Sequence, residues 1–223
     1  MIFSEYISGN NPLMICPKFL SEKHFGNQAK DYLPVDTGIE IECNVPKDWN
    51  KDWLDLPGII ANKSDGQELR LRVPSGLEGF KIIWNICEHL NSNNYILTES
   101  AIHFHIDISE HEENIKVVRN DKDLINYCKN ELLKWDHVNE ITSGNGFNFF
   151  RKPNTIEIRC GKMTFDYKEM IKDIIWSHYI VKYVKEYANQ KENIHYQNLI
   201  IQKREFELTG STLIKNRVIH INL

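Results

Sequence analysis

Three short segments of the chain alternate apolar residues with residues that carry charge or bind metal ions. They span 38–42, 102–107 and 155–159. Residues two apart on a β-strand point to the same face, so each segment is predicted to be a strand with one apolar and one polar face. The chain is thereby constrained to form a sheet that buries hydrocarbon on one side. The other side is expected to collect Glu40, Glu42, His103, His105, Asp107, Glu157 and Arg159.

The periodicity of the remaining chain adds helices and further strands. Apolar residues that recur at intervals of three and four predict three amphipathic helices. These helices span 77–90, 121–135 and 167–188. Further strands are predicted over 68–73, 95–98, 101–108 and 147–150. The second and third of these are expected to form a hairpin or two adjacent strands. Because the helices follow strand pairs instead of alternating with single strands, the sequence predicts an α+β fold with a mainly antiparallel sheet.

Other parts of the chain show no clear period. Prolines and turn residues predict irregular structure over 1–36 and a connection over 46–67. Residues 109–113 are interpreted as a solvated turn. A closing hairpin or short helix is expected over 199–206 and 213–221.

Length and charge narrow the class of protein. The 223 residues suit one domain with a substantial core, and no repeat or linker divides residues 1–223. The net charge of −4 provides no basic field for a nucleic-acid or membrane partner. Neither a signal peptide nor a membrane span is recognisable, so a cytoplasmic location is expected. Abundant Asn, Ile and Lys are typical of an AT-rich coding sequence, such as that of a phage, in which case the location is the host cytoplasm. Five scattered cysteines are expected to be reduced thiols.

Each polar pair has a chemical interpretation and an ordinary structural one. Glu40 and Glu42 on one strand face repel each other unless a cation lies between them, and carboxylates suit Mg²⁺ or Mn²⁺. His103 and His105 have the spacing of two imidazoles that bind one metal ion. The guanidinium of Arg159 provides a donor fork suited to phosphate. Alternatively, such pairs are solvated positions on an exposed sheet face.

The order of the three pairs resembles a known family. Glu-x-Glu, then His-x-His, then Glu-x-Arg is similar to the pattern of the amidoligase family in the glutamine synthetase and glutamate–cysteine ligase superfamily. The segments that carry the resemblance are TGIEIE, KSDGQE, SAIHFHIDIS and FFRKPNTIEIRCGKMTF. The resemblance covers about residues 36–180. It implies a curved antiparallel sheet with helices packed on its outer face, as in the glutamine synthetase catalytic domain.

The resemblance also implies an activity and roles for individual residues. Family members use ATP and Mg²⁺ or Mn²⁺ to join a carboxylate to an amine through an acyl phosphate. The substrate is an amino acid, another small molecule, a peptide or a protein side chain. The implied metal ligands are Glu40, Glu42, His103 and Glu157. His105 is implied to lie near the nucleotide phosphates, and Arg159 and Arg151 to stabilise charge on the transferred phosphoryl group.

The chain departs from the family pattern at two positions. Gln67 occupies the serine position of an Asp-Gly-Ser turn, and Arg70 occupies a strand position that is usually acidic. The missing metal ligand is then expected from Glu68 or Asp65. These departures leave open a binding or virion-associated module that has lost catalysis, for which Trp49 and Trp53 are candidate interface residues.

A cupin-like metalloprotein is a further alternative. His103, His105 and Glu110 match the spacing of the first metal-binding motif of that barrel. The glycines that flank the motif are absent, and three long predicted helices do not suit a small β-barrel.

Overall fold

The protein is described by a computed structural model that covers residues 11–44, 58–63, 66–92, 96–97, 102–134, 146–150, 152–161 and 164–209. Its strands form one antiparallel sheet in the order β2-β3-β1-β5-β7-β6, with β4 paired to the far end of β1. The strands are β1 (Thr37–Asn44), β2 (Gly58–Lys63), β3 (Gly66–Val73), β4 (Ile96–Leu97), β5 (Ile102–Asp107), β6 (Gly146–Phe149) and β7 (Thr155–Gly161).

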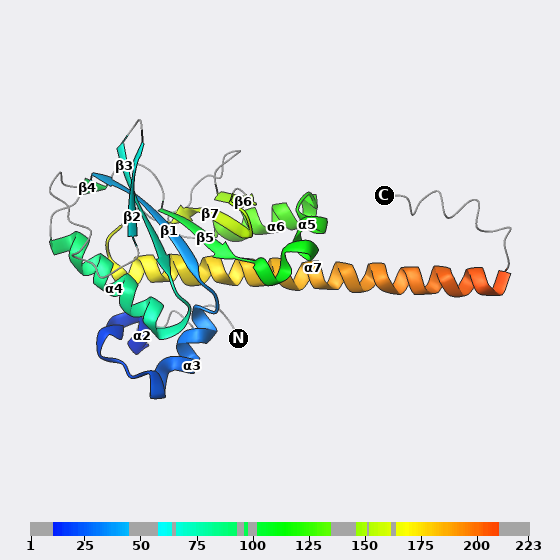
Figure 1. Ribbon diagram of the computed structural model, residues 1–223, viewed down its shortest axis with the longest axis horizontal. Helices are drawn as coiled ribbons and strands as arrows, with labels where there is room; N and C mark the ends of the chain where they lie inside the picture. The colour runs from blue at the N-terminus through cyan, green and yellow to red at the C-terminus, as the bar shows by residue number, and fades with distance from the viewer. Residues whose placement is uncertain are drawn as a thin grey trace.

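The helices cover one face of this sheet. Figure 1 shows α4 and the long α7 running beneath the strands, with α2 and α3 on the far side of α4. The α-helices are α2 (Pro12–Ile15), α3 (Glu22–Tyr32), α4 (Gly76–Ser92), α5 (Glu112–Val118), α6 (Lys122–Leu133) and α7 (Tyr167–Thr209). The described residues also form the short 3-10 helices η1 (Pro17–Phe19) and η3 (Ser109–His111). Among these helices, none combines the length and apolar character needed to cross a lipid bilayer.

Strand alternation separates the core from the polar face, as the sequence predicts. The isoleucines and phenylalanine of the three alternating segments are buried against the helices. They are Ile39, Ile41, Ile102, Phe104, Ile106, Ile156 and Ile158. The predicted apolar stripe of α7 is buried as well, and it consists of Met170, Ile171, Ile174, Ile175, His178, Val181 and Val184. The α+β class, the antiparallel sheet and the placement of helices on one face are therefore confirmed.

Several local predictions are wrong. The segment 1–36 contains α2 and α3 instead of irregular structure. Proline breaks the interior of a helix but is favoured in its first turn, and Pro12 begins α2 after the N-cap Asn11. The helix α3 is mostly polar, and its apolar period rests on only three residues, Phe25, Ala29 and Tyr32. The connection predicted over 46–67 contains β2, an edge strand that pairs with β3.

Two further predictions need correction. The strands β4 and β5 both pair with β1 and not with each other, so they form neither a hairpin nor two adjacent strands of the sheet. The predicted solvated turn at 109–113 is η3 followed by the start of α5. With three and seven residues, η3 and α5 are too short for a helical period to be recognised.

The helix α7 is much longer than the predicted 167–188. It contains 43 residues, which corresponds to about 65 Å. Its buried stripe ends at Ala188, and residues 190–194 are exposed. No proline or glycine follows Ala188 within the helix, so the helix continues without a core to pack on. Residues 199–206 are therefore helical and form no hairpin, while 213–221 lies outside the described residues.

A buried histidine joins α7 to the sheet. His178 lies within 2.8 Å of the Thr37 hydroxyl oxygen through Nε2, and both side chains are buried. Burial, together with the nearby ammonium of Lys185, lowers the pKa of the His178 imidazole from 6.5 to about 3. The folded protein therefore keeps this imidazole neutral at pH values where an unfolded chain protonates it.

We expect stability to fall as the pH falls below 6.5. The unfolded chain then binds a proton that His178 excludes in the folded state, which favours unfolding. Between about pH 7 and about pH 5, the wild type should lose about 2 kcal/mol more unfolding free energy than His178→Gln. Urea titrations at both pH values measure this difference. His24→Gln, at an exposed position, is the control, and an equal pH dependence in all three proteins contradicts the expectation.

Candidate functional site

The strand register gathers the polar pairs at the middle of the sheet. Glu40 on β1 lies opposite Arg70 on β3 and His103 on β5. One step along, His105 on β5 lies opposite Glu157 on β7. Directly opposite residues of an antiparallel pair have Cβ atoms about 5 Å apart, so side chains in these rows meet. Five strands therefore contribute to one site, because Asn148 on β6 also lies opposite Glu157.

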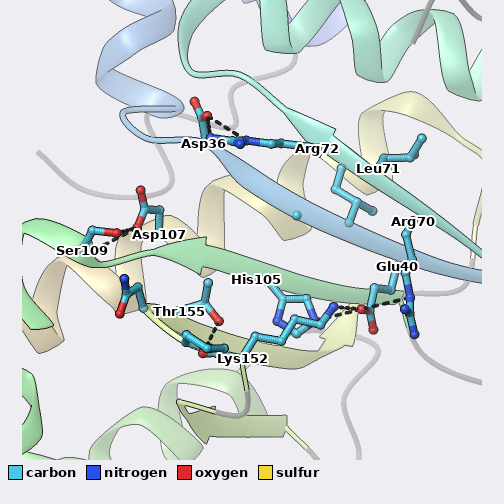
Figure 2. A pocket seen from close by; sticks show the side chains of 14 residues that line it. Asp36, Glu40, Arg70, Leu71, Arg72, His105, Asp107, Ser109, Lys152 and Thr155 are labelled. Atoms are coloured by element: carbon cyan, nitrogen blue, oxygen red, sulfur yellow. Dashed lines mark hydrogen bonds and ion pairs between the residues drawn. The ribbon is translucent and has the colours of Figure 1, made fainter. Parts of the chain in front are cut away.

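Glu40 is the most heavily contacted residue of the site. Its side chain lies 3.4 Å from His103 through Oε2 and Nδ1, and 3.4 Å from His105 through Oε1 and Nε2. The ammonium of Lys152 donates to Oε1, and Arg70 Nε lies 3.7 Å from the same oxygen. Figure 2 shows Lys152 and Arg70 approaching this carboxylate from opposite sides.

These contacts determine the charge of Glu40. Burial by itself raises the pKa of a carboxyl group, and Glu40 is only 7% exposed. The contacts with His103, His105 and Lys152 outweigh burial and hold the pKa of Glu40 well below its ordinary value. Glu40 is therefore a carboxylate throughout the physiological pH range.

A second carboxylate lies even deeper. Glu157 is 1% exposed, accepts a hydrogen bond of 3.0 Å from the Asn148 amide, and lies 3.7 Å from His105 Nε2. One ligand atom from each of Glu40, His105 and Glu157 lies within 4.8 Å of the other two. We call these three residues the carboxylate–imidazole cluster.

His105 provides an independent reason to assign a ligand to this cluster. Its side chain is 5% exposed, and within the described part of the chain neither ring nitrogen has a hydrogen-bond partner of good geometry. A buried polar group without a partner is costly unless something else satisfies it. Two carboxylates and an imidazole are ligands that suit Mn²⁺, Mg²⁺ or Zn²⁺. The donor set thus fits a divalent cation, which in binding Glu40 Oε1 competes with Lys152.

The cluster lies at one end of a pocket of about 410 Å³. Three cationic side chains, Arg70, Arg72 and Lys152, line it together with the carboxylates of Asp36, Glu40 and Asp107. Gly38 also lines the pocket. A larger residue here would crowd His105, because its Cβ would lie 3.2 Å from His105 Cβ. In Figure 2 the pocket extends from Glu40 towards the opposite end of the strands.

Hydrogen-bonded carboxylates mark the far end of the pocket. Asp36 pairs with Arg72, whose Nη2 lies 2.9 Å from Oδ2, and also accepts a hydrogen bond from the Ser75 amide. Asp107 accepts hydrogen bonds from the amide and hydroxyl of Ser109. Burial opposes ionisation of Asp107, but the bonds from Ser109 outweigh it and lower the pKa of this carboxyl.

The turn that carries Lys152 has an unusual backbone. Phe150 and Asn154 have positive φ angles of 54° and 57°, a region that residues other than glycine rarely adopt. Each such residue costs roughly 1–2 kcal/mol of conformational free energy. The two residues bracket the turn and direct Lys152 back over the sheet to Glu40.

The structure brings together some of the predicted site residues and separates others. Glu40, His103, His105 and Glu157 meet, and it is His105 instead of His103 that belongs to the carboxylate–imidazole cluster. Glu42 is half-buried at the next outward-facing position of β1 and lies outside the cluster.

Arg159 lies at a change in the register of β7 against β5. It is half-buried on β7, where the pairing with β5 shifts between Ile102 and Phe104, and it does not line the pocket. This shift limits how far strand alternation predicts the direction of its side chain.

Other predicted residues lie outside the part of the chain that the structure describes. Arg151, Asp65, Trp49 and Trp53 are among them, as are the side chains of Glu68 and Gln67. Only the backbone of Glu68 is placed, opposite Glu42 and Ala61.

Sequence reasoning missed three contributors to the site. Lys152 follows the predicted Arg151, and no periodic signal marks it because it lies in a turn. Asn148 lies in a recognised strand, but its link to Glu157 depends on the register of β6 against β7. Arg70 stands out in the sequence only as a departure from a pattern, although alternation with Leu69 and Leu71 places it on the polar face.

Compared with known protein families, with curated proteins and with solved structures, the chain matches none of them. The family resemblance of its sequence motifs therefore stays a prediction.

We expect Mn²⁺ to bind the carboxylate–imidazole cluster and to depend on its members. Glu157→Gln removes one anionic ligand and should weaken Mn²⁺ binding at least about tenfold. Glu113→Gln, which makes the same chemical change at an exposed position of α5, should leave the affinity within about twofold. Electron paramagnetic resonance titrations of free Mn²⁺ measure both. Equal loss in the two variants would contradict the assignment of the cluster.

Proposed function

We propose that this protein is an ATP-dependent carboxylate–amine ligase with a glutamine synthetase-like catalytic fold. The observation that carries the proposal is the buried carboxylate–imidazole cluster of Glu40, His105 and Glu157 beside a pocket that Arg70, Arg72 and Lys152 also line. Phosphoryl transfer needs cations that neutralise the phosphate oxygens and groups that fix the reactants in line. A carboxylate cluster for a metal ion and cationic side chains in the same pocket for phosphates meet both needs.

The architecture supports the same proposal. The described helices lie on one face of the antiparallel sheet, and the polar pairs lie on the other, where the pocket reaches Glu40 and His105. Glu40, His105 and Glu157 lie on strands, which hold their side chains more rigidly than loops do. We propose in addition that the sheet is curved, as in the glutamine synthetase family.

Each residue has a role in the proposal. Glu40, His105 and Glu157 hold the divalent cation, and His103 orients Glu40 through the contact at Oε2. When bound, Mg²⁺ or Mn²⁺ neutralises phosphate oxygens of ATP. Glu42 and Glu68 are candidates for a further cation at the other end of β1 and β3.

The basic residues complete these roles. Lys152 leaves Glu40 for the nucleotide phosphates when the cation binds, because a cation and an ammonium compete for the same oxygen. Arg159 does not line the pocket, so its contribution of positive charge to the transferred phosphoryl group, like that of Arg151, rests on the family resemblance alone. Arg70 occupies the position expected to be acidic, so a guanidinium neutralises Glu40 at this end of the pocket.

The reaction itself requires no protein nucleophile. A carboxylate oxygen of the substrate attacks the γ-phosphorus of ATP, and ADP leaves. The nitrogen of an amine then attacks the acyl carbon, phosphate leaves, and an amide forms. The protein contributes position and charge to both steps, which accounts for a site made of carboxylates, imidazoles and cationic side chains.

One observation favours a second candidate function, a binding module without catalysis. Lys152 and Arg70 already neutralise Glu40 without a metal ion. If the neutralised state were permanent, the polar face would serve only to bind a partner. A cupin-like barrel is less well supported, because the described strands form an open sheet that ends at β2 and β6, and Glu110 is exposed outside the cluster.

Nucleotide and metal ion should stabilise the protein more when both are present than the sum of their separate effects. We expect a thermal shift with Mg²⁺ plus a non-hydrolysable ATP analogue that exceeds the sum of the two single shifts, because the cation is shared between the cluster and the phosphates. Glu40→Gln should abolish this excess, and Glu113→Gln, at an exposed position on α5, should retain it.

A chemical trap then tests the ligase step. With ATP, Mg²⁺, hydroxylamine and a mixture of carboxylates, an acyl phosphate is converted to a hydroxamate as ADP forms. Stoichiometric ADP and hydroxamate are expected from the wild type. A joint thermal shift without any hydroxamate would favour another phosphoryl transfer, and no joint shift would favour the binding module.

A further inference from the structure

A second pocket, of about 400 Å³, lies on the helix side of the sheet. Ile106 of β5 lines it, whereas the neighbouring residues His105 and Asp107 line the first pocket. Because successive residues of a strand point to opposite faces, the two pockets lie on opposite sides of β5. The second pocket is therefore separate from the proposed catalytic site, and its capacity to bind a ligand is independent of the ligase proposal.

The floor of the second pocket is apolar. Ile106, Ile175 and Val181 line it and are buried. Tyr32 of α3 and Tyr179 of α7 also line it, and Tyr179 is held by stacking on Trp176, with ring centroids 5.2 Å apart. Volume and lining match those of pockets that take small molecules, which are mostly apolar with a few polar groups.

The charged groups of this pocket are mainly cationic. Lys30 of α3 and Lys182 and Lys185 of α7 line it, against a single carboxylate, Asp31. Across the described residues, none of the three ammonium groups forms an ion pair with a carboxylate. This contrasts with exposed lysines elsewhere, such as Lys116 and its two glutamate partners.

Lys185 is the most informative of the three lysines. It is half-buried, and its ammonium donates a long hydrogen bond of 3.4 Å to the backbone carbonyl of Asp107. Burial lowers the pKa of this ammonium, and the charges of Asp107 and Glu110 only partly oppose that effect. An ammonium has three donors, so an anion in the pocket would relieve its incomplete solvation.

His178 adds no charge to the pocket wall. Its pKa of about 3 keeps the imidazole neutral at physiological pH, and Nε2 is engaged with Thr37. The positive charge of the pocket therefore comes from lysines.

We propose that this pocket binds a small organic carboxylate whose apolar body rests on Ile106, Ile175 and Val181 and whose anionic group is held by Lys182 and Lys185. The apolar floor supplies affinity through burial, and the lysines select for negative charge. Lys30 extends the cationic rim from the opposite wall.

Two probes of the same size separate the roles of the floor and the lysines. 3-Phenylpropionate carries the charge, and 3-phenylpropan-1-ol has the same body without it. By ligand-observed NMR on the full chain, we expect saturable binding of the acid and at least about tenfold weaker binding of the alcohol. Equal affinities for the two probes would overturn the proposal, as would no saturable binding of the acid up to about 10 mM.

Lysine variants locate the site. Lys182→Glu should weaken binding of 3-phenylpropionate about tenfold, because it reverses a charge at the pocket. Lys122→Glu makes the same change at an exposed position of α6 and should leave the affinity unchanged. Equal weakening in both variants would show that binding depends only on the net charge of the protein, and it would contradict the proposed site. Binding to phosphatidylserine vesicles in place of the small acid would likewise overturn it and indicate a lipid surface.

Discussion

The antiparallel register of β1, β5 and β7 is the constraint on which the rest of the site depends. It places Glu40 beside His103 and His105 beside Glu157, so that charges spread over more than a hundred residues of sequence meet on one sheet face. A shift of one residue in any of these strands would send its charged side chains into the core and its isoleucines to solvent. The burial of the apolar face therefore fixes the geometry of the polar face.

Burial gives these carboxylates their chemical character. Glu40 and Glu157 are almost inaccessible to solvent, and a buried carboxylate is costly unless positive charge or hydrogen bonds compensate it. Lys152 and Arg70 compensate Glu40, and Asn148 donates to Glu157, while His105 lacks a partner of good geometry among the described residues. The site thus combines charge that is already neutralised with one unsatisfied imidazole. A divalent cation would satisfy that imidazole and release Lys152 for a phosphate.

Sequence predicted those parts of the structure that depend on periodicity. The alternating strands, the stripe of α7 and the meeting of Glu40, His103, His105 and Glu157 follow from side-chain direction, which has a fixed period of two or 3.6 residues. The polar helix α3 shows only a sparse period, and the short strand β2 and the continuation of α7 past Ala188 lack one. The contributions of Lys152 and Asn148 depend on a turn and on a register, neither of which a single sequence specifies. The same limit explains why His105 and not His103 completes the cluster.

The central claim is that one divalent cation is shared between the carboxylate–imidazole cluster and nucleotide phosphates. Electron–nuclear double resonance of protein-bound Mn²⁺ with a non-hydrolysable ATP analogue tests this claim most directly, because it detects the nuclei bonded to the metal ion. We predict nitrogen coupling from one imidazole together with phosphorus coupling from the nucleotide, and loss of the nitrogen coupling in His105→Gln. Phosphorus coupling without any protein nitrogen would contradict the claim, since the nucleotide would then carry its metal ion without the cluster.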